Sequence, residues 1–131
     1  MLGCGCDICD QRRFRKRSAD ELDALCTKIL STDELEQLAS MVHPERRIAF
    51  IAGRFAAKEA FSKALGVGIS ADFSFLDLSI DSRGGKPQLR LSEKLAGLLT
   101  KRGLQSMKQI DLSISHDGDY ALAFVCIQFA D

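Results

Sequence analysis

A predicted helix near the middle of the chain carries a carboxylate inside its apolar stripe. Residues 48–66 are rich in alanine and close on a glycine, which favours a helix. At helical spacing, Glu59 shares a stripe with Ile48, Ile51, Ala52, Phe55 and Ala56. A buried carboxylate must be paired, protonated or bound to a metal, because desolvating it alone costs too much free energy. Lys63, one turn further on, is a candidate partner, and an ordinary surface Glu–Lys pair is the alternative.

A second carboxylate stands on an otherwise bare face of a predicted strand. The first residues alternate, with Leu2, Cys4, Cys6 and Ile8 on one face and Gly3, Gly5 and Asp7 on the other. Glycines in a strand let another backbone or a ligand come close. Asp7 therefore either lies where a ligand comes close to the strand or caps a turn.

The cysteines do not form a recognisable framework. They stand at positions 4, 6, 9, 26 and 126, an odd number. A zinc site from Cys4, Cys6 and Cys9 is conceivable, but a distant matching pair is missing. We expect cysteines that fill the core as reduced thiols, which fits the cytoplasm.

Composition limits the class of protein. The 131 residues carry 18 basic and 18 acidic side chains, so the net charge gives no general attraction to nucleic acid or membrane. We expect one domain over residues 1–131, with neither a transmembrane helix nor a secretion signal.

The order of predicted elements favours an α+β fold, a mostly antiparallel sheet packed against a long helix. Ser18 with Glu21, and Ser31 with Glu34, match capping boxes, so helices should begin near residues 19 and 32, the second ending near 43–44. The remaining expected elements are a strand at 2–8, the helix at 48–66, a hairpin of 75–80 with 88–91, a short helix from Ser92 to about 101, and a hairpin of 110–115 with 120–128.

Four segments, in order, carry a resemblance that spans nearly the whole chain. They are Gly3–Ile8, the run Gly53–Gly66, Gly85-Lys86-Pro87, and Leu112–Asp117. Together they resemble the 4′-phosphopantetheinyl transferases, and more narrowly the short type that modifies acyl carrier proteins. The chain departs from the usual pattern at Cys4, Cys6, Cys9, Asp10 and Val67, and at Glu21 and Ala24 in the docking region.

The resemblance implies an enzyme that moves the phosphopantetheine arm of coenzyme A onto a serine of acyl carrier protein, for fatty-acid synthesis. Adenosine 3′,5′-bisphosphate is the other product. It also implies a Mg²⁺ cofactor, a cytoplasmic location and a homotrimer with active sites between subunits. Mg²⁺ takes hard oxygen ligands, usually one or two carboxylates with phosphate oxygens and water.

The resemblance assigns roles residue by residue. Asp7 and Glu59 would bind the metal, and Lys63 would neutralise or protonate the leaving oxygen. The serine proton could go to a metal-held water, to Glu59 or to His116, for which coenzyme A binding comes first. Expected contacts of coenzyme A are Arg54, Lys63, Gly66, Gly68, Gly85, Lys86, Ser115 and His116. For Arg54 and Lys58 a solvated helix face explains the pattern equally well.

The basic stretch at residues 12–17 suits an acidic protein partner. The resemblance places carrier-protein docking on this segment, with Arg13 as the best match and Arg15 and Arg17 beside it, and Lys28, further along the chain, is a second candidate. Two other classes remain: a non-catalytic module that binds an acidic protein, and a nucleic-acid-binding domain. The zero net charge weakens the second, and intact Asp7, Glu59 and Lys63 weaken the first.

Overall fold

A computed structural model describes residues 1–67, 69, 73–103 and 106–130. The helices are α1 (Arg12–Arg15), α2 (Ala19–Ile29), α3 (Thr32–Ala39), α4 (Pro44–Leu65) and α5 (Glu93–Lys101), with a 3-10 turn η1 (Phe75–Asp77). The strands are β1 (Leu2–Asp10), β2 (Leu78–Asp81), β3 (Gln88–Leu91), β4 (Met107–Asp117) and β5 (Tyr120–Phe129).

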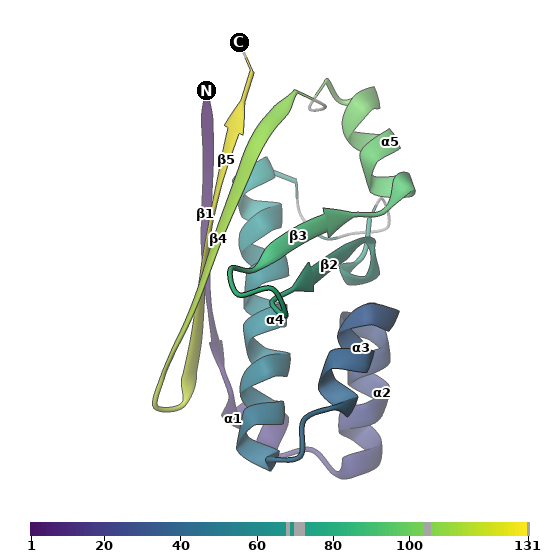
Figure 1. Ribbon diagram of the computed structural model, residues 1–131, viewed down its shortest axis with the longest axis vertical. Helices are drawn as coiled ribbons and strands as arrows, with labels where there is room; N and C mark the ends of the chain where they lie inside the picture. Colours follow the sequence, from purple (N-terminus) through teal and green to yellow (C-terminus); the bar gives the residue numbers. More distant parts are fainter. Residues whose placement is uncertain (68, 70–72, 104–105, 131) are drawn as a thin grey trace.

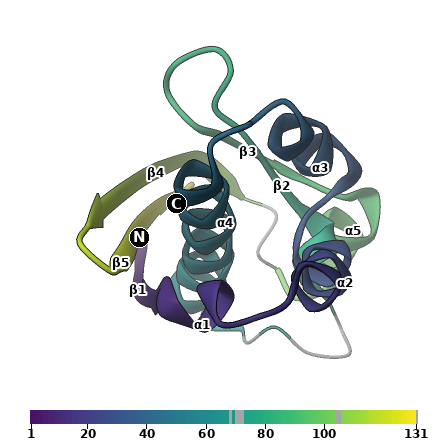
Figure 2. The same cartoon turned by 90° about the horizontal axis from the view of Figure 1, so that it is seen from below.

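The long helix α4 lies between two layers (Figure 1). On one side the antiparallel sheet β1-β5-β4 curves around it, and on the other lie α2, α3, α5 and the β2–β3 hairpin (Figure 2). Because both layers cover α4, most of its side chains are buried, including charged ones. The expected α+β fold, with an antiparallel sheet packed against a long helix, is confirmed.

The two faces of the large sheet differ in what covers them. Alternate residues of β5, from Ala121 to Phe129, are buried against α4. The other face is exposed in this chain and carries large apolar side chains: Leu2, Ile8, Tyr120, Leu122 and Phe124. We call this the outer sheet face.

Glycines bring β1 and α4 into close contact. A Cβ added to Gly3 would collide with the carbonyl oxygen of Ala64, and one added to Gly5 would collide with that of Ala60. The prediction that another backbone approaches this glycine face is therefore confirmed. The same approach carries the next residue on that face, Asp7, to the surface of α4.

Helix boundaries follow local capping chemistry. Both predicted capping boxes form: the Ser18 hydroxyl accepts from Glu21 N, and the Ser31 hydroxyl accepts from Glu34 N, each at 3.2 Å. Helix α4 begins at Pro44, four residues before the alanine-rich run, and ends at Gly66 with φ +75°. A proline is favoured at the first helical position, and a glycine adopts the left-handed conformation without strain.

Two expectations about the elements were wrong, and one element was not expected. Helix α3 ends at Ala39 rather than near residue 43, and the basic stretch contains a short helix, α1, that no sequence pattern had indicated. Residues 75–77 form a 3-10 turn, because Ser74 and Asp77 make a further capping box there. As a result Leu76 is exposed, whereas Leu78 and Ile80 in β2 are fully buried.

The cysteines only partly fill the core. All five are free; Cys9 and Cys26 are buried, whereas Cys4 and Cys6 are exposed on the outer sheet face. Cys4 lies opposite Cys126, with 3.8 Å between the two sulfur atoms. The expectation of core-filling thiols was therefore wrong for Cys4 and Cys6 within this chain. Among the described residues, no helix combines the length and apolar character that crossing a membrane requires.

Candidate active site

Asp7, Glu59 and Lys63 lie together where β1 crosses α4. The Lys63 ammonium donates to Asp7 Oδ1 at 3.0 Å and to the carbonyl of Cys6 at 3.1 Å. The hydrogen bond to Asp7 raises the pKa of Lys63, which therefore remains a cation at neutral pH. The partner of Lys63 is thus a residue of the neighbouring strand, and the pairing with Glu59 considered from helical spacing is not the contact that forms.

Glu59 is a half-buried carboxylate beside a second carboxylate. Burial raises its pKa, and the negative charge of Asp7 raises it further, while Lys63 and Arg13 oppose the shift. The two acids are therefore close enough to repel each other, in a setting that also disfavours charge. Such a pair can bind a divalent cation or accept a proton.

Arg54 and His116 border a different hollow, a cavity of about 390 Å³ on the far half of α4. His116 Nε2 donates to the carbonyl of Ala49 at 3.0 Å, which holds the imidazole beside the first turns of the helix. The Arg54 guanidinium donates to the Ser82 hydroxyl at 2.9 Å and lies over the Phe50 ring at 4.3 Å. Its cationic edge therefore faces a hollow between α4, α3 and the β2–β3 turn.

The structure does not bring His116 to the carboxylates within one chain. The helical residue that His116 contacts, Ala49, precedes the carboxylate Glu59 by ten positions, which is about 15 Å along the axis. Ser115 adjoins His116 on β4 but lies on the outer sheet face, opposite Leu122. One chain therefore presents two partial sites at separate places along α4.

The view of Arg54 and Lys58 as a solvated helix face was wrong. Arg54 is 6% exposed and Lys58 is fully buried. The Lys58 ammonium reaches Glu34 Oε1 at 2.5 Å, and Glu34 is fully buried as well. Both charges are thus internal, and only the end of the Arg54 side chain is directed to a cavity.

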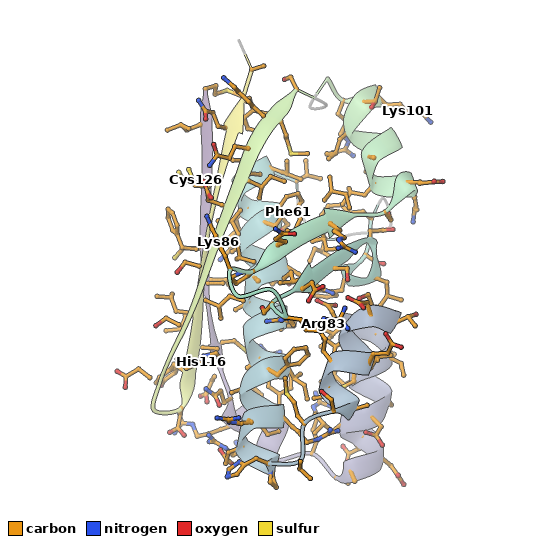
Figure 3. All side chains as sticks on the ribbon, viewed as in Figure 1. Phe61, Arg83, Lys86, Lys101, His116 and Cys126 are labelled. Carbon is orange, nitrogen blue, oxygen red and sulfur yellow. The ribbon has the colours of Figure 1, made fainter. Side chains whose placement is uncertain are left out.

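The remaining expected coenzyme contacts lie in turns. Gly66 and Gly85 both have positive φ, at the end of α4 and in the β2–β3 turn, so turn geometry alone accounts for them. Gly68 lies outside the described residues. Lys86, which is labelled in Figure 3, remains largely exposed. Its ammonium pairs with Asp111 of β4 at 2.8 Å.

The basic stretch is partly neutralised inside the chain. Arg15 pairs with Glu45 at 3.0 Å and with Asp119 at 2.8 Å, so it joins α1 to the start of α4 and to the β4–β5 turn. The Arg13 guanidinium lies over the Phe55 ring at 4.9 Å, near the carboxylate site. Arg17 and Lys28 are exposed, so Arg13, Arg17 and Lys28 remain the available docking charges among the four expected ones.

Sequence reasoning missed several residues of the cavity. Its lining also includes Gln37, Ser40, Arg46, Ser82 and Arg83. Figure 3 shows Arg83 on the hairpin turn, toward α3, and His116 on the opposite side of α4. No motif marks these positions, and only the packing of α3 and the hairpin on α4 brings them together.

Comparison with known proteins matches both the sequence and the fold. Residues 3–125 match the model of the 4′-phosphopantetheinyl transferase superfamily. A holo-[acyl-carrier-protein] synthase of Methylibium petroleiphilum is 37% identical, over 98% of this chain and 96% of that protein. The crystal structure of such a synthase from Neisseria meningitidis has 33% identity and a TM-score of 0.82, and covers 98% of this chain and 99% of its own. The crystal structure of a holo-(acyl-carrier-protein) synthase from Bacillus anthracis, in complex with CoA (3′,5′-ADP), has 34% identity and a TM-score of 0.77. It covers 98% of this chain and 96% of its own. The chain therefore belongs to the 4′-phosphopantetheinyl transferase superfamily.

Proposed function

We propose that this chain, as a single domain over residues 1–131, is the transferase that activates acyl carrier protein for fatty-acid biosynthesis. It transfers the 4′-phosphopantetheine group of coenzyme A to a serine of the apo-carrier protein and releases adenosine 3′,5′-bisphosphate. The observation that carries the proposal is the meeting of Asp7, Glu59 and Lys63 where β1 crosses α4. Relatives of this length and fold bear the corresponding name.

The carboxylate pair suits Mg²⁺. A half-buried acid, Glu59, beside a second carboxylate, Asp7, is a ligand set that a hard divalent cation accepts, with water and phosphate oxygens completing its shell. Mg²⁺ held by Asp7 and Glu59 would neutralise charge on the pyrophosphate of coenzyme A. The family resemblance assigns the metal ligands to Asp7 and Glu59; among the described residues no group of three or more His, Cys, Asp or Glu side chains could hold a metal ion.

The side chains of the cluster divide the chemistry between them. The serine oxygen forms a bond to the phosphorus that carries the pantetheine arm, and the bond from that phosphorus to the bridging oxygen breaks. Lys63, cationic beside Asp7, stabilises or protonates the bridging oxygen as it leaves. Glu59, whose pKa is raised, is placed to accept the serine proton.

The second partial site suits the nucleotide end of coenzyme A. Arg54 and His116 provide donors for its phosphates, and Gly66, Gly68, Gly85, Lys86 and Ser115 are the further contacts that the family resemblance implies. Since this cavity and the carboxylates are separate in one chain, we place a complete site between subunits of a homotrimer. The exposed apolar outer sheet face supports that assembly.

The protein partner is an acidic acyl carrier protein in the cytoplasm. Arg13, close to Glu59 and stacked on Phe55, connects the docking surface to the reacting groups. Arg17 and Lys28 extend the positive surface, while Arg15 acts mainly through its internal ion pairs.

Intact mass spectrometry of an apo-acyl carrier protein tests the proposal directly. We expect a gain of one phosphopantetheine in the presence of this protein, coenzyme A and Mg²⁺, and none with a chelator. Asp7→Ala and Glu59→Ala should lose the activity while they keep their far-ultraviolet circular dichroism. Retained turnover in both variants would contradict the assignment of the metal ligands.

A further inference from the structure

A fully buried ion pair, Lys58–Glu34, lies directly behind the cavity that Arg54 lines. Neither residue is exposed, and the two charged groups are 2.5 Å apart. A buried pair of this kind is expensive to desolvate, and apolar residues of similar volume often stabilise a core as well or better. Stability alone is therefore a weak reason for the pair.

The pair joins four separate segments to α4. The three hydrogens of the Lys58 ammonium are donated to Glu34, to the carbonyl of Ile29 at 2.7 Å and to the carbonyl of Phe75 at 3.0 Å. Glu34 accepts from Ile80 N at 3.0 Å and, as part of the capping box, from Ser31 N at 2.9 Å. The end of α2, the start of α3, the turn η1 and strand β2 are thus tied to one point of the helix.

Hydrogen bonds continue from this point into the cavity wall. Gln37, one turn after Glu34 on α3, donates to the carbonyl of Ile80 at 3.2 Å. Arg54, one turn before Lys58 on α4, donates to Ser82, two residues after Ile80, and to Gln37 at 3.5 Å. Three wall residues, Gln37, Arg54 and Ser82, are therefore linked by hydrogen bonds or by one helical turn to residues that the buried pair holds.

Arg54 itself depends on Glu34 for its charge balance. Its Nε is buried without a hydrogen-bond partner and lies 3.9 Å from Glu34 Oε2. Burial lowers the pKa of Arg54, and the negative charge of Glu34 opposes that shift. Glu34, with a smaller contribution from Asp81, thus balances the inner side of the guanidinium, while Nη2 donates to Ser82 and Gln37 in the cavity wall.

We infer that Glu34, neutralised by Lys58, is a positioning residue that orients Arg54 toward the phosphates of the nucleotide in the cavity. The inference rests on the proposed role of Arg54 in coenzyme A binding and extends it to residues behind the cavity. Neither Glu34 nor Lys58 needs to touch the coenzyme.

A double-mutant cycle measured by calorimetry tests the inference, with coenzyme A and adenosine 3′,5′-bisphosphate as probes. The neutral variant Lys58→Met/Glu34→Gln removes both charges, and the amide oxygen of Gln keeps an acceptor for one of the two backbone N–H groups that Glu34 binds. We expect its dissociation constant for both probes to rise about tenfold, which corresponds to 1.4 kcal/mol. In the Arg54→Gln background the same change should have almost no further effect, because the pair acts through Arg54. At saturating coenzyme A, kcat of the neutral variant should stay within about threefold of the wild type.

Control variants separate orientation from loss of stability. Leu99→Ala removes a buried side chain of α5 outside the cavity lining, so it should lower the Tm without changing the affinity for either probe. Wild-type affinity in a folded neutral variant, or additive losses in the cycle, would overturn the inference and leave the proposed function intact. If Arg54→Gln leaves the affinity for both probes unchanged, or if the wild type binds neither probe, the nucleotide role of Arg54 fails. The inference then fails with it.

Discussion

Replacing Lys63 by methionine should remove catalysis while leaving the fold almost unchanged. Lys63 is 54% exposed and its partner Asp7 is 17% exposed, with 3.0 Å between the charged groups. At that distance the attraction in water is about 1.4 kcal/mol. Solvent screening and the entropy of a long side chain reduce the net contribution to below about 1 kcal/mol. For a chain of this size that is a fall of roughly 3–5 °C in Tm.

The expected effect on turnover is far larger. A positioned group that protonates or neutralises a leaving oxygen contributes about 10²- to 10⁴-fold, and the loss should appear in kcat because the interaction strengthens in the transition state. The assay is the rate of phosphopantetheine transfer to apo-acyl carrier protein, followed by intact mass, beside a thermal melt of each variant.

Lys94→Met is the matched control. Lys94 is 64% exposed and lies 3.9 Å from Asp77, which is 11% exposed, so it repeats an exposed lysine beside a mostly buried acid, away from the site. We expect a similarly small change in Tm and full activity. If Lys63→Met kept its kcat within about threefold, or if both variants lost activity alike, the role given to Lys63 would be refuted.

Three further predictions concern pH, packing and assembly. The hydrogen bonds from Arg12 lower the pKa of Asp10 from 3.8 to about 2, so its stabilising effect is present above pH 4 and is lost as the pH falls toward 2. Asp10→Asn should therefore lower the Tm at pH 7 but not at pH 2, and an equal deficit at both values would contradict this. Gly5→Ala should destabilise the protein by roughly 1–3 kcal/mol in urea denaturation, because the new methyl group meets the backbone of α4. Gly97→Ala, in a helix and with open space around it, should instead stabilise by about 0.5–1 kcal/mol, and a neutral Gly5→Ala would disprove the close approach. Phe124→Glu, on the outer sheet face, should shift the mass measured by light scattering from trimer to monomer, whereas Leu76→Glu, equally exposed on η1, should not; a trimeric Phe124→Glu variant would exclude that face as the subunit contact.

The pairing of Asp7 with Glu59 was expected from the family resemblance, since each carboxylate taken alone had an ordinary explanation, a turn cap or a lysine pair. The glycine face of β1 and the alanine-rich run of α4 are local patterns, and two such surfaces pack closely because neither has bulky side chains. In the structure Asp7 follows the glycines and Glu59 stands among the alanines, so the packing of the two surfaces brings the carboxylates together. The partner of Lys63 could not be chosen in this way, since helical spacing offers Glu59 but does not include the strand that crosses beside it.

Local sequence patterns could not predict the cavity. Its walls come from α3, α4, the β2–β3 turn and β4, and their meeting depends on tertiary packing. Glu34 illustrates the difficulty. Its capping box with Ser31 was predicted from spacing and is confirmed, but this local role gave no sign that the same carboxylate also binds Lys58 and faces Arg54.

The geometry of α4 explains how one short signature serves two layers. Arg54 and Lys58 are four residues apart and share one stripe, while Glu59 and Lys63 are also four apart and share the next, turned by about 100°. The first stripe is directed to α3 and the β2–β3 hairpin, and the second to β1. Adjacent residues Lys58 and Glu59 therefore have opposite environments: Lys58 is an internal charge behind the cavity, and Glu59 is a half-buried acid beside Asp7. Any shift of α4 between its layers would disturb both sites at once, which is a physical reason for the buried ion pair and the tight glycine contact to hold the helix from opposite sides.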